Sequence, residues 1–265
     1  MTASPGAAGR GRLGAMEHEP AAQERPEGRL AVVGAGRMGH ALVIALAGAH
    51  GPFGRGFDGG GYDTVLLAVP DAAIPTAAAA VLPGPLVGHC AGAIGLDVLA
   101  PHEAFGLHPL MTVTRAGAAF RGSGAAVAGS TPRALALARH LATELGMHAV
   151  EIRDHDRPAY HAAASIASNF LVTLEDAAEQ LLATTGADRR ILVPLVRAAM
   201  ENWAALGGRT AITGPIARGD EATVARQRAA VAARTPHLLD LFDALCAQTQ
   251  TMVRGGDPDA HAPQR

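Results

Sequence analysis

The sequence predicts a two-domain protein in which an α/β domain with a mainly parallel sheet precedes an all-helical domain. Up to about residue 153, short apolar runs typical of buried strands alternate with helical segments, the order that builds a parallel sheet. Beyond that point the apolar residues follow helical spacing and no convincing strand occurs. We therefore assign residues 29–153 to the α/β domain and 154–254 to the helical domain, between a disordered leader (1–28) and a frayed tail (255–265).

The individual elements follow from periodicity and from turn residues. Strands of the first domain are expected at residues 30–33, 64–69, 86–90, 104–108, 125–128 and 147–152. Its helices are expected at residues 38–49, 71–83 and 132–145, the last capped by Thr131. The second domain should consist of long helices at residues 158–184, 188–206 and 220–253.

A glycine-rich turn joins the first strand to the first helix with the spacing G-x-G-x-x-G. This pattern is typical of a dinucleotide-binding turn, in which the phosphates lie at the helix N-terminus. Gly34 would allow the tight turn, Gly36 the close approach of a pyrophosphate, and Gly39 close packing of helix on strand. The alternative is an ordinary glycine turn. From this turn and the end of the strand at 64–69 we expect cofactor contacts by Gly34, Ala35, Gly36, Arg37, Met38, Gly39, Val69 and Pro70.

The nature of the dinucleotide depends on the residues about 20 positions after the turn, where an acidic residue favours NAD and an arginine favours NADP. Both Arg55 and Asp58 lie in this window. We favour NADP because Arg55 is closer to the expected end of the second strand, although a solvated arginine in a glycine loop is the alternative. The surrounding stretch 51–61 is glycine-rich and a poor strand by propensity.

The composition argues against nucleic-acid binding, membrane insertion and secretion. The formal net charge is -2 and the arginines are scattered, so no nucleic-acid surface is expected, and no apolar run is long enough for a membrane span. The first 28 residues lack the apolar core of a secretory signal, and Met16 is an alternative start. Cys90 and Cys246 lie far apart and fit a reduced, cytoplasmic protein.

Lysine is absent, and all 22 basic residues counted as Lys or Arg are arginine. This excludes a Walker phosphate loop, Schiff-base chemistry and a Tyr-Lys proton relay. Histidines are the leading proton donors. His89 and His108 each lie at the carboxyl end of an expected parallel strand, where ligands bind, although either ring might instead hydrogen-bond a loop carbonyl. A metal site at these histidines with Cys90 and His102 has no standard spacing, and we expect none.

Two segments of the helical domain also carry polar groups suited to a small substrate. His161, Ser165 and Asn169 are spaced by four residues, which places them on one helix face that suits either a cleft wall or a polar seam between domains. Arg218 and Asp220 follow a Gly-Pro turn at a helix start, where they would bind an anionic substrate or form a capped turn with a local ion pair.

Five segments together resemble a family of Rossmann-like oxidoreductases with a helical C-terminal domain of unknown function. They are residues 32–39, 67–71, 107–109, 160–163 with Ser168-Asn169, and 213–220. The resemblance covers about residues 29–250. The glycine turn is shared with pyrroline-5-carboxylate reductase, ketopantoate reductase and the 6-phosphogluconate dehydrogenase superfamily, whose C-terminal domain has the same helical plan.

The resemblance implies an NADP-dependent reductase of a small carbonyl or imine compound in the interdomain cleft, with ketopantoate or a related 2-oxo acid tried first, and a homodimer through the helical domain. His161 or His108 would donate the proton, since His161 is the natural substitute for a lysine used in the wider superfamily. Asn169 would orient the substrate and Arg218 would bind its carboxylate, with His89, Ser165 and Asp220 as further contacts. The absent lysine, and Ala91 where the family often has serine, favour the alternative of a catalytically silent dinucleotide sensor.

Overall fold

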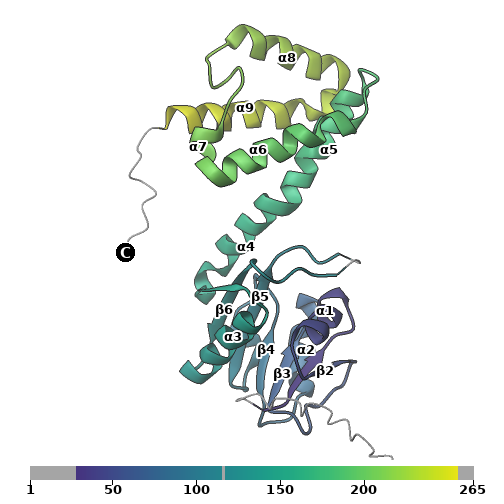
Figure 1. The fold of residues 1–265 in the computed structure, drawn as a ribbon, viewed down its shortest axis with the longest axis vertical. Helices are drawn as coiled ribbons and strands as arrows, with labels where there is room; N and C mark the ends of the chain where they lie inside the picture. The colour runs from purple at the N-terminus through teal and green to yellow at the C-terminus, as the bar shows by residue number, and fades with distance from the viewer. Residues whose placement is uncertain (1–27, 115–116, 256–265) are drawn as a thin grey trace, which may run out of the picture. The chain divides into compact units, whose positions relative to one another are not determined.

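The computed structural model describes residues 28–114 and 117–255 (Figure 1). The chain forms two compact units that meet between Ala164 and Ser165. The first unit extends past the boundary that we set from the sequence at residue 153, because the helix that begins at Arg157 is anchored in this unit by that buried side chain. The expected leader, the alternative start at Met16 and the expected tail lie outside the described residues, apart from Gly28 and Gly255.

The first unit contains a seven-stranded sheet in the order β2-β1-β3-β4-β5-β6-β7. Strands β1 to β5 are parallel, β6 runs antiparallel to β5, and β7 is parallel to β6. The fold class predicted from the sequence is confirmed. The strand bounds are β1 Leu30–Val33, β2 Ala49–Phe53, β3 Thr64–Leu67, β4 Leu86–His89, β5 Ala104–Leu110, β6 Gly124–Gly129 and β7 His148–Glu151.

Helices cover both faces of this sheet, and the alternation of side chains along each strand sorts the core into two layers. Leu30 and Val32 of β1 belong to the layer that includes residues of α1 (Arg37–Ala45) and α3 (Pro132–Glu144). Ala31 and Val33 belong to the layer beneath α2 (Ile74–Ala80) and the 3-10 turn at residues 96–99. Thr131 caps α3 as expected, because its Oγ1 accepts a hydrogen bond from Ala134 N at 3.1 Å.

A strand forms at the start of the glycine-rich segment after α1, whereas residues 54–61 are not part of it. Helix α1 ends at Ala45 rather than at Ala49, and β2 begins at Ala49. Pairing with β1, in the register Leu30 with Ala49 and Val33 with Phe53, overrides the poor strand propensity of this segment. The end of β2 is thereby held beside the end of β1.

The second unit is helical but its helices are shorter than expected. Helix α4, Arg157–Ser165, belongs to the first unit up to its last residue. The second unit has a π-helical turn at Ile166–Phe170, α5 Leu171–Ala183, α6 Val193–Leu206, α7 Gly208–Ala211, α8 Glu221–Arg234 and α9 Leu239–Arg254. The expected helix at 220–253 is wrong because it breaks at Thr235-Pro236, where proline cannot donate the backbone hydrogen bond of a helix interior. The π turn likewise interrupts the expected helix at 158–184, and none of the described helices has the length and hydropathy of a membrane span.

The second unit has almost no buried core of its own. Among its described residues only Val231 and Thr235 are buried. Large apolar side chains remain exposed instead, with Trp203 at 58% and Leu195 at 66% exposure on α6. Such a surface is typical of a region covered by another protein chain.

Candidate functional site

The glycine turn after β1 has the geometry that its sequence predicted. Gly34 adopts φ +114°, and a Cβ at this position would collide with the carbonyl of Ala68. A Cβ at Gly39 would collide with the carbonyl of Gly34, so helix α1 packs directly on the turn. A Cβ at Gly36 would meet nothing within 4 Å. The turn is therefore closed toward the protein at Gly34 and Gly39 and open at Gly36.

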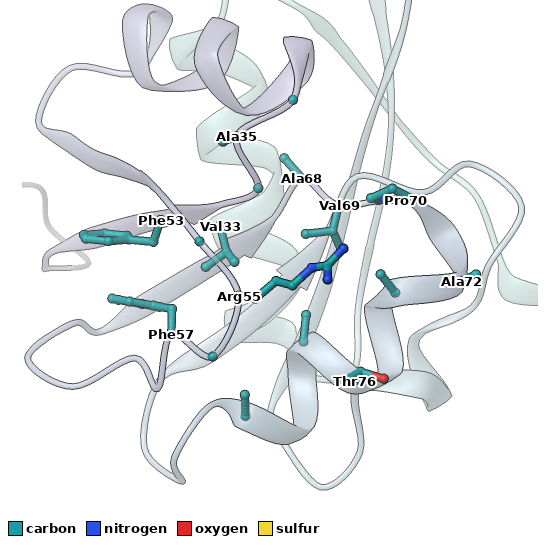
Figure 2. Close-up of a pocket in the computed structure, with 17 residues that line it drawn as sticks. Val33, Ala35, Phe53, Arg55, Phe57, Ala68, Val69, Pro70, Ala72 and Thr76 are labelled. Carbon is teal, nitrogen blue, oxygen red and sulfur yellow. The ribbon is translucent and has the colours of Figure 1, made fainter.

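Backbone hydrogen bonds hold the carboxyl ends of three strands together at this turn. Gly34 N donates to Phe53 O of β2 at 2.8 Å, and Ala68 N donates to Val33 O of β1 at 2.7 Å. These strand ends enclose a pocket of about 740 Å³ lined by the glycine turn, by the segment 53–57, and by residues at the start of α2. Figure 2 shows that the Arg55 side chain extends across this pocket toward Val69.

Of Arg55 and Asp58, the two candidates for determining whether NADP or NAD binds, only Arg55 lines the pocket. Arg55 is the one charged side chain among the described residues that line it. Asp58 is not part of the lining, and its Oδ1 instead accepts a hydrogen bond from Gly60 N at 2.9 Å within its own loop. Phe53 and Phe57 stack with ring centroids 4.1 Å apart at the pocket edge.

The pocket fits the adenosine and phosphate part of a dinucleotide. The N-terminus of α1, including Arg37 and Met38, follows the open Gly36, and a helix N-terminus with free N–H groups attracts phosphate. Ala35, Val69 and Pro70, which we expected to contact a cofactor, all line the same pocket. These residues would hold a dinucleotide, which supplies hydride chemistry at its nicotinamide when bound.

His89 has no ring nitrogen available for a substrate in this structure. The side chain is fully buried, its Nε2 lies 3.1 Å from Gly95 O, and its Nδ1 accepts a hydrogen bond from Ala91 N at 3.2 Å. Burial lowers the pKa of this imidazole from its usual value, and the Arg157 cation lowers it further. His89 thus has the arrangement that we weighed as its structural alternative, a strand-end histidine that hydrogen-bonds a loop carbonyl.

His108, Tyr160 and His161 form a cluster at the carboxyl end of β5. His108 Nδ1 lies 2.8 Å from the Tyr160 hydroxyl, and the two rings meet edge to face at 5.6 Å. The His161 ring centroid is 6.2 Å from that of His108. A Cβ at Gly92 would lie 2.7 Å from His161 Cδ2 and 2.9 Å from His108 Nε2, so the glycine makes room for both rings.

The surroundings of this cluster favour neutral side chains. Burial lowers the pKa of His108 to about 4, with smaller contributions from His161, Arg157 and His89. Burial also raises the pKa of the Tyr160 phenol, against the opposing effect of Arg157. At neutral pH His108 is therefore an unprotonated imidazole and Tyr160 a protonated phenol.

Four of the predicted substrate contacts, Ser165, Asn169, Arg218 and Asp220, belong to the second unit. Ser165 is half-buried and Asn169 is exposed, and the π turn at Ile166–Phe170 interrupts the regular four-residue spacing that would have placed them on one face with His161. Asp220 caps α8, since its Oδ1 accepts a hydrogen bond from Thr223 N at 3.0 Å. Hydrogen bonds from the side chain and then from the backbone of Thr223 lower the pKa of this carboxyl group. Arg218 and Asp220 line a cavity of about 560 Å³ with Arg228 and Arg254.

Comparison with known protein families finds a match in the C-terminal half of the chain. A family model described as a domain of unknown function (DUF2520) matches residues 123–249. The match covers slightly less than half of the 265 residues. The DUF2520 match begins at the start of β6 and ends within α9, and no curated protein matches the chain.

Solved structures share both parts of the fold. A protein from Thermotoga maritima superposes with a TM-score of 0.74 at 21% identity, over 85% of this chain and 98% of that one. A Bacteroides fragilis protein named provisionally as an NADP oxidoreductase gives 0.69 at 18% identity, over 84% and 97%. A Plasmodium falciparum pyrroline carboxylate reductase with NADP bound gives 0.54 at 13% identity, over 85% and 98%.

The DUF2520 match and the shared fold support the resemblance that the five sequence segments indicated. Sequence reasoning did not assign a role to Tyr160 or to Arg157, although both stand next to the His161 motif. The pairing of Tyr160 with His108 joins residues 52 positions apart, so it depends on the fold. Among the described residues no group of three or more His, Cys, Asp or Glu side chains gathers to hold a metal.

Proposed function

We propose that this DUF2520-containing protein is an NADP-dependent oxidoreductase that reduces a small carbonyl or imine compound. The observation that carries the proposal is the pocket at the ends of β1, β2 and β3, which combines a glycine turn open at Gly36 with a single lining charge, Arg55. A guanidinium without a competing carboxylate suits the additional phosphate of NADP. The Plasmodium falciparum reductase with NADP bound, which shares the fold, supports this choice.

The substrate class is proposed by analogy and from the polar residues near the sheet edge. A 2-oxo acid such as ketopantoate is the first candidate, and a cyclic imine is the second, as the name of the Plasmodium falciparum relative suggests. The proposal assigns proton transfer to the cluster of His108, Tyr160 and His161. Asn169 would orient the substrate, and Arg218 would bind its carboxylate.

Of the further substrate contacts that the sequence suggested, Ser165 and Asp220 remain part of the proposal. His89 does not, because both of its ring nitrogens contact backbone groups. Asp220 Oδ1 caps α8, and the same residue lines a cavity together with Arg218.

A homodimer through the helical unit is part of the same proposal. Val193, Val196, Met200 and Trp203 follow each other at helical spacing along α6, and three of the four are exposed. A helical unit with a single buried aliphatic residue, Val231, gains the missing core by packing against a second copy. Arg218 of that second copy would then complete the substrate site. The proposed location is the cytoplasm, consistent with two free cysteines.

The second candidate function is a dinucleotide sensor without catalysis. The absence of lysine and the presence of Ala91 favour it, since both remove groups that related reductases use. A sensor would bind the dinucleotide at the same pocket and convert no substrate.

Turnover measurements with binding controls distinguish the two functions. The purified chain is incubated with NADPH and either ketopantoate or 1-pyrroline-5-carboxylate, and nicotinamide absorbance is followed. A reductase loses turnover in His161→Ala and Asn169→Ala but keeps NADPH affinity. His155→Ala, at an exposed histidine, is the matched control and should keep both. Binding without turnover on a broad panel of carbonyl and imine compounds would support the sensor.

A further inference from the structure

Arg157, the first residue of α4, is a fully buried cation that no role proposed so far explains. Its Nε donates to Asp154 Oδ1 at 3.0 Å, and its Nη1 donates to Ala91 O at 3.3 Å in the turn after β4. Its side chain has no exposed surface, whereas that of Asp154 is 51% exposed. Burying a charge this deeply costs desolvation free energy, which an ion pair and hydrogen bonds must offset.

One edge of this guanidinium is unpaired. Arg157 Nη2 is buried and has no hydrogen-bond partner among the described residues. It lies over Gly106 of β5, where an added Cβ would be 2.7 Å from Nη2. Gly106 pairs with His89 of β4 and is two residues before His108, so these three residues face the same side of the sheet. The cation therefore lies on the sheet face that carries both histidines.

Arg157 acts electrostatically on three ionisable groups, His89, His108 and Tyr160. The cation contributes to the lowered pKa of His89 and of His108, because either protonated ring would add a second buried positive charge. It also opposes the rise in the pKa of the Tyr160 phenol. His161 is the remaining ionisable group that faces His108 from α4. The sheet face that carries His108, the hydrogen-bond partner of the Tyr160 phenol, thus also carries a permanent positive charge.

We propose that Arg157 is a positioning residue whose buried guanidinium fixes the start of α4 against the turn after β4 and stabilises the phenolate that Tyr160 forms when it donates a proton. The proposal rests on the proposed function, and it names Tyr160 as the proton donor in place of either histidine. Neutral His108 is the hydrogen-bond partner of the phenol rather than the acid.

The proton step balances without a further reactant. The carbon of the C=O or C=N bond would receive the hydride that a bound reduced nicotinamide supplies, as the π bond breaks. The oxygen or nitrogen takes the proton from the Tyr160 hydroxyl as that O–H bond breaks. The phenolate is stabilised by the Arg157 charge and by His108 Nδ1–H, and it regains a proton from solvent after the product leaves.

The titration of Tyr160 tests the role of Arg157 without any substrate. The chain has two tyrosines, so Tyr62→Phe leaves Tyr160 as the single phenol whose ultraviolet absorbance reports ionisation. In this background Arg157→Met, which keeps length and removes charge, should raise the Tyr160 pKa relative to Arg157→Lys. Arg139→Met, at an exposed arginine paired with Glu151, is the matched control and should cause no shift.

A second variant keeps the test decisive if Arg157→Met does not fold. Asp154→Asn retains a hydrogen-bond acceptor but removes the negative charge beside Arg157. Without the Asp154 carboxylate to neutralise it, the Arg157 charge stabilises the Tyr160 phenolate more strongly, so the Tyr160 pKa should fall. An unchanged pKa in both Arg157→Met and Asp154→Asn would overturn the proposal.

Turnover of Tyr160→Phe tests the assignment of the donor. With NADPH and the better of ketopantoate and 1-pyrroline-5-carboxylate, kcat should fall by roughly 100-fold or more while NADPH affinity is kept. Arg157→Lys should retain more of kcat than Arg157→Met at the same NADPH affinity. Wild-type kcat in Tyr160→Phe would overturn this proposal and leave the reductase intact. Failure of every dinucleotide to bind would instead refute the proposed function, and the titration would still report on Arg157.

Discussion

At the scale of single residues, burial changes the acid–base behaviour of His108 in a way that stability measurements detect. Its pKa is about 4 in the folded protein and about 6.5 in an unfolded chain. Between these values the unfolded state binds a proton that the native state does not, so stability is lost as pH falls through this window and is constant above it. Urea unfolding should show a loss from this group of about 2 kcal/mol between roughly pH 7 and pH 5.

Replacing the buried ring isolates this contribution. His108→Asn should remove about 2 kcal/mol of the pH dependence over that range. His155→Asn, at an exposed histidine next to Asp156, serves as the control and should leave the dependence unchanged. An identical pH dependence in His108→Asn and the wild-type chain would show that the ring is not protected from protonation.

The residues of the site differ in how far the sequence could predict them. The roles of Gly34 and Gly39 follow from spacing, because backbone geometry within one turn is local. The sequence favoured Arg55 over Asp58 by position alone, because only the fold shows which of the two side chains the loop directs into the pocket. The importance of Tyr160 and Arg157 depends on contacts with β5 and with the turn after β4, which only the folded chain brings together.

At the scale of elements, the strand–turn–helix unit predicts opposite consequences for two glycine substitutions. Gly34→Ala should lower stability by about 1–3 kcal/mol, since a positive φ is strained for alanine and the new Cβ meets the Ala68 carbonyl. Gly36→Ala should leave stability unchanged, because its Cβ meets no protein atom within 4 Å. It should nevertheless abolish NADPH binding by occupying the space of a phosphate.

Thermal unfolding and NADPH titration of both variants measure these effects. If Gly36→Ala bound NADPH as tightly as the wild-type chain, phosphates would not lie at this turn. A stable Gly34→Ala variant would show that the turn adapts to a side chain.

Local propensity predicted the secondary-structure elements that depend on their own residues. It failed for elements whose formation depends on tertiary contacts. Thr131 and the helix that it caps were predicted because capping is local. Strand β2 forms through pairing with β1, although the segment Ala49–Phe53 contains glycine and proline. The break at Thr235-Pro236 had a local signal, the proline, which the long helical periodicity on both sides obscured.

At the scale of the whole molecule, the exposed apolar surface of the second unit predicts a homodimer. Sedimentation at micromolar concentrations should give twice the mass of one chain, and unfolding should depend on protein concentration. Trp203→Glu, which adds a charge to the exposed stripe of α6, should produce monomers. Glu201→Gln, a neighbouring exposed position on α6, is the control and should remain dimeric. A wild-type chain that is monomeric at all concentrations would contradict the proposed dimer.

The measurement that tests the central claim most directly is a comparison of NADPH and NADH affinities for the wild-type chain and Arg55→Ala. We predict that the wild-type chain prefers NADPH and that saturation at about 100 times the Kd raises its stability by about 2.7 kcal/mol. Arg55→Ala should weaken NADPH binding by roughly 10-fold or more and leave NADH binding unchanged. Asp58→Asn should keep the wild-type preference, since its carboxylate contacts its own loop. Absence of binding by either dinucleotide would contradict the account.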